Sequence, residues 1–242
     1  MFYEKKIYIT AEYCDYTVRL GNYQFFYLLQ NAMTDGFEVI DCGNRGLGRR
    51  CNGYWAVTKT KLDIFRKPNW AEEVIVKSSF THDGKLRIHI KTEISSLSGE
   101  VLAKGCQEIC VLDRNTHRPK RLSDTCLPVG ENTGEPLGKF EKFSDFREVN
   151  NSYEHIVRSQ NIDMSRHVNN IEYIRMAMDL FSVDELCEKE VCSMEVHYIG
   201  ECREGEKLIC ERSDRENESY LRILKDTKPT FEMKIEFNKN LT

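Results

Sequence analysis

The sequence lacks any long apolar run. No stretch approaches the roughly 18 consecutive apolar residues that a membrane-spanning helix needs, so we expect no membrane insertion. Residues 1–9 also lack the apolar core of a signal peptide and are instead interpreted as part of a strand. We therefore expect a cytoplasmic protein.

A basic excess is absent as well. The net charge of −4 and the pI near 5.9 argue against general nucleic-acid binding, which is usually accompanied by a basic balance. With 40% hydrophobic and 31% charged residues, the composition is that of a globular protein. A chain of 242 residues is long enough for one large domain or two small ones.

The ten cysteines follow no metal-binding pattern, and the sequence contains no C-x-x-C. Without a secretory context, disulfides are not expected either. We interpret most of the cysteines as small buried hydrophobic side chains in a reducing compartment. No structural zinc, other metal or cofactor is expected.

The most informative stretch is residues 161–173. Asp163, Ser165 and His167 stand at alternate positions, so on an extended backbone their side chains would leave the same face. The apolar residues that follow fall at helical spacing, which predicts a helix over 168–186. A helix start offers unpaired N–H groups, so an imidazole and a carboxylate beside it suggest a reaction centre. A capping loop with a surface histidine is the alternative, because Asp, Ser and Asn are ordinary N-cap residues.

An internal repeat gives this stretch a counterpart. At an offset of 148, Asp15 falls on Asp163 and Thr17 on Ser165, and a helical pattern follows each motif, through about Val39 in the first copy. Strands are predicted at 3–13, 54–65, 73–80, 86–94 and 101–112, and again at 153–160, 191–202, 206–214, 218–226 and 229–237. This order predicts an α+β fold with an N-terminal half at 1–122, a Pro/Gly-rich linker at 123–150 and a C-terminal half at 151–242.

The repeat also indicates which half performs chemistry. His167 has Arg19 as its counterpart, and Glu201 has Lys67 at an offset of 134. The potential acid–base groups are therefore present only in the C-terminal half. The first half has extra residues around 43–53, a glycine-rich basic segment that lacks the order of a phosphate-binding loop. We interpret that segment as a solvated loop, or alternatively as a docking patch for an anionic partner.

Several segments resemble the acyl-acyl carrier protein (ACP) thioesterases of plant plastids and bacteria. Residues 163–170 resemble that family's D-x-N-x-H-V-N-N signature, with Ser165 in place of the usual Asn; residues 54–61 and 66–70 resemble its first-half strand and turn, and 198–203 the segment that holds its glutamate. The resemblance implies a tandem double hotdog, in which each half is a long helix packed on an antiparallel sheet. It also implies hydrolysis of fatty acyl-ACP thioesters, which ends chain elongation. Without a transit peptide, the chain is similar to the bacterial members.

The resemblance names Asp163, Ser165, His167 and Glu201 as catalytic candidates. We expect Glu201 and His167 to position and deprotonate water, and Asp163 to orient the imidazole. The N–H groups of Val168 and Asn169 at the helix start would stabilise the oxyanion. Direct attack by a carboxylate, giving a mixed anhydride, stays open. Cys202 is a weak alternative nucleophile, because neighbouring side chains diverge on a strand.

Two further groups of residues are candidates for substrate binding. The acyl-pocket candidates are Phe25, Phe26, Leu29, Met33, Trp55 and Val57. The candidates for docking the acidic carrier protein are Arg45, Arg49, Arg50, Arg118, Lys120 and Arg121. An acyl-CoA thioesterase and a non-catalytic acyl-binding module are the competing functions, and a homodimer is an open alternative.

Overall fold

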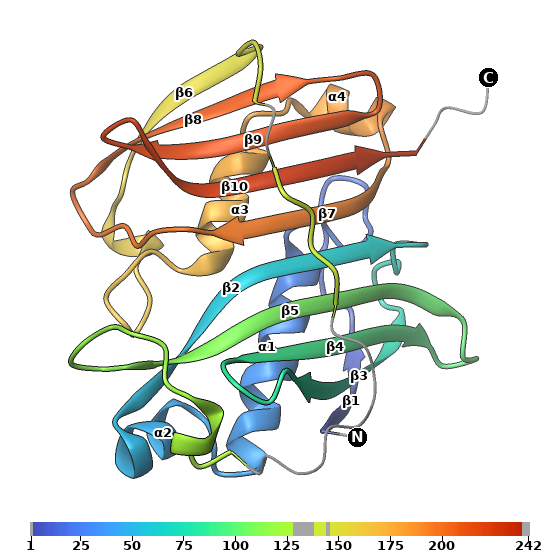
Figure 1. Ribbon diagram of the computed structural model, residues 1–242. Coiled ribbons are helices and arrows are strands. Elements are labelled where there is room, and N and C mark those ends of the chain that lie inside the picture. The colour runs from blue at the N-terminus through green and yellow to red at the C-terminus, as the bar shows by residue number, and fades with distance from the viewer. Residues whose placement is uncertain (1, 128–137, 144–145, 239–242) are drawn as a thin grey trace.

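The computed structural model describes residues 2–127, 138–143 and 146–238. Its strands form one antiparallel sheet in the order β1-β3-β4-β5-β2-β7-β10-β9-β8-β6 (Figure 1). The strands are β1 Tyr3–Tyr8, β2 Gly53–Ile64, β3 Glu73–His82, β4 Arg87–Ser96, β5 Val101–Asp113, β6 Asn151–Ile156, β7 Val191–Tyr198, β8 Lys207–Asp214, β9 Glu218–Lys225 and β10 Lys228–Phe237. The first five strands and the last five meet where β2 pairs with β7, from Lys59↔His197 to Asp63↔Ser193.

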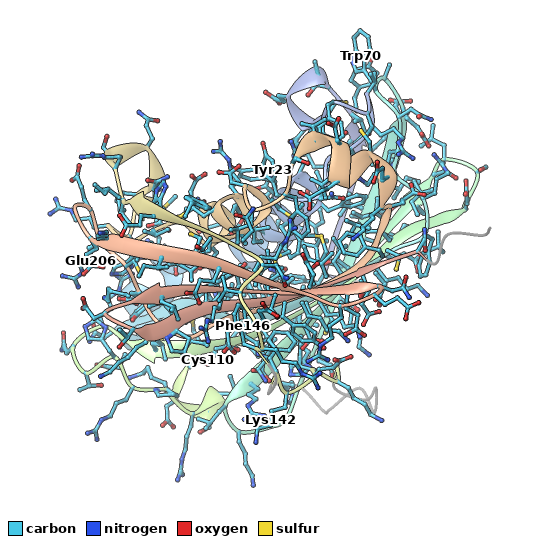
Figure 2. The ribbon with its side chains drawn as sticks, turned by 90° about the horizontal axis from the view of Figure 1, so that it is seen from above. Tyr23, Trp70, Cys110, Lys142, Phe146 and Glu206 are labelled. Carbon is cyan, nitrogen blue, oxygen red and sulfur yellow. The ribbon has the colours of Figure 1, made fainter. Side chains whose placement is uncertain are left out.

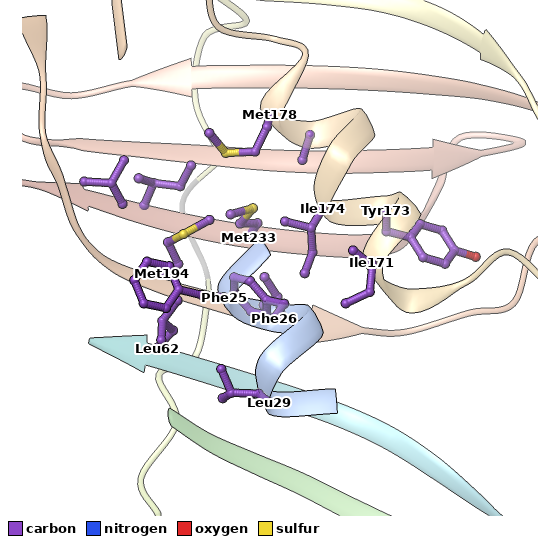
Figure 3. Packing of buried hydrophobic residues seen from close by; sticks show 14 of the residues in the cluster. Phe25, Phe26, Leu29, Leu62, Ile171, Tyr173, Ile174, Met178, Met194 and Met233 are labelled. Carbon is purple, nitrogen blue, oxygen red and sulfur yellow. The ribbon is translucent and has the colours of Figure 1, made fainter. Parts of the chain in front are cut away.

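Both long helical segments cover the same face of this sheet. In α1 (Gln24–Val39), Phe25, Leu28, Leu29 and Ala32 recur at helical spacing and are buried against the first five strands. In α3 (Asn170–Met178), seven of nine residues are buried against the last five. Figure 3 shows the buried side chains of α1 and α3 meeting over β2, β7 and β10. One hydrophobic core therefore runs through both halves.

The helix predicted over 168–186 is wrong in its length. The structure has α3, then a break, then the separate short helix α4 (Val183–Glu188). Ser182 starts α4, because its hydroxyl accepts from the Glu185 N–H while the Glu185 carboxylate accepts from the Ser182 N–H. This reciprocal cap fixes a new helix start where apolar periodicity predicted continuation.

The interpretation of residues 43–53 as a loop is also wrong. Residues Asn44–Cys51 form α2, which packs on β2. Leu47 is fully buried, and a side chain at Gly46 would collide with the backbone of Asp41, so this glycine permits the close approach. The Trp55 indole N–H donates to the Cys42 carbonyl at 2.9 Å and fixes the segment that leads into α2. Tertiary packing overrides the poor helix propensity of glycine here.

Two predicted strands end earlier than expected, at equivalent places. Strand 3–13 stops at Tyr8 and is followed by the 3₁₀ turn Ala11–Tyr13, and strand 153–160 stops at Ile156 before the 3₁₀ turn Ser159–Asn161. The other predicted strands are confirmed with small shifts of their ends, the largest at 191–202, where β7 ends at Tyr198.

Residues 138–143 and Phe146, in the middle of the segment expected to be a linker, lie on the face opposite the helices, whereas Cys126 and Leu127 pack with the second hydrophobic cluster around α2. Figure 1 shows this middle part crossing in front of the sheet with α1 and α3 behind, and in Figure 2 Phe146 and Lys142 lie on the side of the sheet opposite Tyr23. Phe143 stacks on His197 with ring centroids 4.1 Å apart, and the Arg222 guanidinium lies 3.9 Å from the ring centre of Phe146. Aromatic contacts thus anchor the linker to a charged sheet surface.

A His–Glu pair on β4 and β5 supports Gly138, in the middle of this segment. The Gly138 N–H donates to His89 Nδ1 at 2.8 Å, and His89 Nε2 lies 3.5 Å from Glu108 Oε2. The nearby His89 imidazole, with further help from Thr58 and nearby cations, lowers the pKa of Glu108 to about 2 against the opposing effect of burial. Beside the linker lies a groove of about 650 Å³, whose lining includes Lys61, Lys77, Lys91, Lys104 and Lys139.

The interpretation of the cysteines is partly wrong. Cys42, Cys110, Cys202 and Cys210 are buried, but five others are only half-buried and Cys187 is exposed. All ten are free thiols. The hydrophobicity of cysteine alone does not determine which sheet face it occupies, because Cys106 and Cys110 lie on the linker side of β5.

Within the described ranges, no helix is long and apolar enough to cross a membrane. The same residues contain no group of three or more His, Cys, Asp or Glu side chains arranged to hold a metal ion.

A tight turn before β3 recurs before β8 with a different residue. Ala71 has φ 64° and Gly205, its counterpart at the offset of 134, has φ 84°. Their N–H groups donate to the equivalent carbonyls of Ile9 and Val157. A Cβ at Gly205 would touch nothing within 4 Å, so any cost of adding one is conformational.

We therefore expect Gly205→Ala to lower the free energy of unfolding by about 1 kcal/mol, because L-residues are disfavoured at positive φ. Ala71→Gly should be neutral or slightly stabilising for the same reason. Urea denaturation measures both. Gly200→Ala is the control, since Gly200 lacks positive φ and its Cβ would make only ordinary contacts. Equal losses for Gly200→Ala and Gly205→Ala would contradict the conformational explanation.

Candidate active site

The loop that carries His167 is a closed turn. The Asp163 N–H donates to the His167 carbonyl at 2.9 Å, and the Ser165 N–H donates to Asp163 Oδ1 at 2.8 Å. Arg166 has φ 64°, which reverses the chain between these bonds. The expectation of an extended backbone with three side chains on one face is wrong. The carboxylate of Asp163 instead holds the turn together.

The first half folds the same turn from different residues. The Asp15 N–H donates to the Arg19 carbonyl at 2.9 Å, the Thr17 N–H to Asp15 Oδ1 at 2.8 Å, and Val18 has φ 58°. Every backbone bond of the Asp163 turn therefore has a counterpart 148 residues earlier. The Asp-x-(Ser/Thr) pattern specifies the shape of the turn, whereas chemistry depends on the residue that the turn presents, His167 or Arg19.

A second segment brings Glu201 to the imidazole. The Val168 N–H donates to the Cys202 carbonyl at 2.9 Å, which ties the end of the turn to the segment after β7. His167 Nε2 then lies 3.2 Å from Glu201 Oε2. The two side chains are 21% and 47% exposed, so solvent and substrate can reach the pair. Such a pair can accept a proton from water and hold the resulting charge.

The corresponding place in the first half is closed. Lys67 Nζ lies 3.6 Å from Asp15 Oδ2, and the lysine side chain is only 6% exposed. Burial lowers the pKa of Lys67, while the nearby Asp15 raises it. This ion pair also shows that a side chain at the position of Glu201 reaches the first carboxylate of the turn. The role of the Asp163 carboxylate beside the His167–Glu201 pair stays a prediction.

The expected oxyanion donors are wrong. The Val168 N–H is bonded to the Cys202 carbonyl, and the Asn169 N–H donates to the Asn161 carbonyl at 2.9 Å. Neither is free to bind a developing negative charge. Sequence pattern located the start of α3 correctly but could not show that tertiary contacts consume these two donors.

Cys202, the residue after Glu201, is fully buried. The Tyr173 hydroxyl donates to the Gly200 carbonyl at 3.3 Å, and burial, with a contribution from Cys202, raises the pKa of Tyr173. A buried thiol beside a neutral phenol is poorly placed for attack, which agrees with the low weight given to Cys202 as nucleophile.

Two residues of the first half that were not site candidates, Tyr54 and His117, form a pair near enough to Glu201 for its charge to act on Tyr54. The Tyr54 hydroxyl hydrogen-bonds to His117 Nδ1 at 3.0 Å, and burial followed by the charge of Glu201 raises the pKa of Tyr54. Tyr54 stands at the start of β2, before the residues that pair with β7, and His117 lies in the loop after β5. No motif links residues so far apart: the sequence singled out Tyr54 only as the first residue of the 54–61 resemblance, and it gave no signal for His117.

The acyl-pocket candidates lie on the helix side of the N-terminal half. Phe25, Phe26 and Leu29 belong to the main core, whereas Met33 belongs to a second cluster around α2. Trp55 and Val57 are half-buried against that second cluster. The structure thus brings these six residues to one face of the sheet but divides them between two clusters.

The docking candidates do not form one patch of unpaired cations. Arg49 and Arg50 both pair with Asp41, and Lys120 pairs with Asp113. Arg45 is exposed on α2, and Arg118 and Arg121 are exposed in the segment after β5. Among these, Arg118 directly follows His117.

Comparison of the sequence with known proteins finds a matching domain family and several similar proteins. Residues 145–239 match the acyl-ACP thioesterase C-terminal domain family. A chloroplastic acyl-ACP hydrolase of Cuphea viscosissima is 24% identical over 192 residues, which are 72% of this chain and 45% of the relative. A chloroplastic oleoyl-acyl carrier protein thioesterase of Coriandrum sativum is 20% identical over 187 residues, 72% and 50% of the two chains. The chain thus spans about half the length of these curated relatives.

Solved structures show the same fold over nearly the whole chain. An acyl-ACP thioesterase from Bacteroides thetaiotaomicron aligns with a TM-score of 0.82 at 17% identity, covering 97% of both chains. The 12:0-ACP thioesterase from Umbellularia californica aligns with a TM-score of 0.82 at 14% identity, covering 98% of this chain and 96% of that one. The expected tandem double hotdog is confirmed, although the second helix is shorter than predicted. This chain is therefore similar to the acyl-acyl carrier protein thioesterases, and its residues 145–239 match the family of their C-terminal domain.

Proposed function

We propose that this protein hydrolyses fatty acyl-ACP thioesters to free fatty acid and carrier protein. The observation that carries the proposal is the His167–Glu201 pair, 3.2 Å apart and open to solvent, at the one of two equivalent turns that has acid–base residues. The relatives named as acyl-ACP hydrolases and thioesterases support the choice of substrate. A pure binding module would have no need of this pair.

In the proposed mechanism, Glu201 and His167 position a water molecule and remove its proton as its oxygen attacks the thioester carbonyl. Asp163 supports the imidazole through the turn it closes, and the exposed Ser165 lies beside the incoming substrate. Collapse of the tetrahedral intermediate releases the carrier-protein thiolate, which takes up the proton. The same residues permit attack by a carboxylate, with water then hydrolysing the anhydride.

The oxyanion needs a donor other than Val168 or Asn169. We assign this role to the N–H of Asn170, the first residue of α3. A residue at that position has no acceptor within its own helix and lies at the positive end of the helix dipole. The Asn169 side chain caps the helix by accepting from the Ile171 N–H at 2.9 Å, which holds the neighbouring Asn170 N–H in place.

The two halves divide the work in this proposal. The N-terminal half, 1–122, holds the acyl chain under α1, and the C-terminal half, 151–242, performs hydrolysis, with 123–150 as the linker. The acidic carrier protein docks beside the site, where Arg118 is exposed next to the Tyr54–His117 pair. Arg49, Arg50 and Lys120 are weaker docking candidates, because acidic partners already neutralise them.

Free-thiol release from a chain-length series of acyl-ACP and acyl-CoA thioesters tests this function. We expect turnover of acyl-ACP with a clear chain-length preference. If acyl-CoA is turned over faster than acyl-ACP at every chain length, the substrate is an acyl-CoA thioester and the carrier protein is not the partner. Tight binding of acyl-ACP without thiol release would show that the fold has kept its pocket and lost its chemistry.

A further inference from the structure

Four polar residues interrupt the apolar inner face of the N-terminal half. They are Ser78 on β3, Thr92 on β4, Gln107 on β5 and Thr60 on β2, and each is at most 4% exposed. On every one of these strands, the inward-facing neighbours of the polar residue are apolar. We call these four residues the polar band.

The sheet register places the polar band across adjacent strands, with a step between β4 and β5, where Gln107 is paired with Ile90. Ser78 is paired with Thr92, and their hydroxyls hydrogen-bond at 2.8 Å. Thr92 is paired with Gly105, which is followed on the same face of β5 by Gln107, and Gln107 is paired with Thr60. The band therefore crosses four adjacent strands beneath α1.

The polar band separates the two hydrophobic clusters of this half. On the main-core side lie Val76, Ile94, Ala103 and Leu62, and on the side of the second cluster lie Phe80, Ile90, Ile109 and Val57. The acyl-pocket candidates are divided in the same way, with Phe25 and Leu29 on one side and Met33 and Trp55 on the other. A fatty acyl chain long enough to contact both sets has to cross the band.

Gln107 is the member of the band with unused hydrogen-bonding capacity. Its Oε1 atom is buried and has no hydrogen-bond partner among the described residues. An unpaired buried carbonyl costs about 1–3 kcal/mol, so such groups normally have a partner. The oxygen can only accept, so the missing partner has to be a donor.

The helix leaves little room directly over the centre of the band. Leu29 of α1 lies so close to Gly105 that a Cβ there would collide with the leucine side chain. Figure 3 shows Leu29 projecting from α1 beside β2. An acyl chain that enters this half therefore passes beside Leu29, and Gln107 is the next inward-facing residue along β5.

We propose that the acyl pocket is built for a fatty acyl chain that carries a hydroxyl group, whose O–H donates to Gln107 Oε1 as the chain crosses the polar band. This inference rests on the proposed function, because it takes the space under α1 as the acyl pocket. A hydroxyl supplies the missing donor, whereas an oxo group or an unsubstituted methylene does not. A methylene at this point would also displace any water that satisfies Gln107 in the empty protein.

Binding of free fatty acids tests the proposal independently of catalysis. Isothermal titration compares unsubstituted, hydroxylated and oxo-substituted fatty acids of matched length, with the substituent moved along the chain, against the native protein. We expect one hydroxyl position to bind about tenfold more tightly than the unsubstituted chain, and the oxo analogue to gain nothing.

Gln107→Met keeps the length of the side chain and removes the acceptor, so it should abolish that tenfold preference. Gln24→Met is the matched control: Gln24 is equally buried and also has an unpartnered Oε1, but it lies at the start of α1, outside the polar band. Its variant should keep the preference.

Three results would overturn the proposal. The first is that unsubstituted and hydroxylated chains of matched length bind equally tightly at every length. The others are a hydroxyl preference that survives Gln107→Met, and no fatty-acid binding at all. Equal binding would identify an ordered water as the partner of Gln107. Thiol release from unsubstituted acyl-ACP, measured separately, decides the proposed hydrolase function whichever of these results is obtained.

Discussion

His167→Gln is expected to lower kcat for acyl-ACP hydrolysis by about a thousandfold, because a positioned general base contributes 10²–10⁴ in rate. Glutamine keeps a polar side chain of similar reach but cannot take up the proton from water. Glu201→Gln should cost a comparable factor, since the amide removes the negative charge that lies 3.2 Å from the imidazole. Single-turnover thiol release with saturating acyl-ACP measures the chemical step directly.

The internal repeat provides a matched control. Arg19 occupies the position of His167 in an equivalent turn, so Arg19→Gln changes the same place in the fold without touching the proposed site. Its kcat should stay within about twofold of the native value, because surface substitutions are usually mild. A double variant, His167→Gln with Glu201→Gln, should lose no more than the worse single variant, since residues that act as a unit are not additive. Full activity of the His167 variant would remove the pair from the mechanism.

Asp15→Asn is expected to lower the free energy of unfolding by about 3 kcal/mol, because it leaves the buried Lys67 ammonium without its countercharge. The amide retains an oxygen that can accept from the Thr17 N–H, so the turn itself is preserved. Chemical denaturation at neutral pH measures the loss. Glu154→Gln removes a carboxylate from the exposed Lys207 pair and should cost less than about 1 kcal/mol.

Two observations separate charge burial from loss of packing. Replacing both partners, Asp15→Asn with Lys67→Met, should recover most of the stability, because no buried charge remains. The stability of Asp15→Asn should also rise as the pH approaches 10.5, the reference pKa of lysine. The folded state lowers the pKa of Lys67, so the unfolded chain binds more protons over this range and raising the pH favours folding. If the double variant is as unstable as Asp15→Asn, the lost free energy of unfolding comes from packing and not from a buried charge.

Much of the fold was predictable because its signals are local. Period-two alternation located the strands, and the repeat of the Asp-x-(Ser/Thr) turn related Asp15 to Asp163 from the sequence alone. The same alignment associated Glu201 with Lys67, and the structure places Glu201 beside His167. Whether these residues perform hydrolysis is still a prediction.

The errors come from contacts between segments that are distant in sequence. Helix α2 forms although three glycines lie at 43–48, because its packing on β2 outweighs their low helix propensity. The Val168 and Asn169 N–H groups are consumed by the carbonyls of Cys202 and Asn161, which no periodicity encodes. The Tyr54–His117 pair joins residues 63 positions apart and likewise depends on how β5 returns beside β2.

The junction between β2 and β7 has a consequence for how the chain matures during synthesis. The first five strands can assemble as soon as β5 has been made, but β2 then remains an open edge until β7 is translated, with the whole linker and α3 in between. An open edge is a template for pairing with other nascent chains. The junction segment of β2 carries Lys59, Lys61 and Asp63, whose charges discourage such pairing without preventing the later union with β7. The charges along this strand therefore matter most while β2 is still an open edge, before β7 has been made.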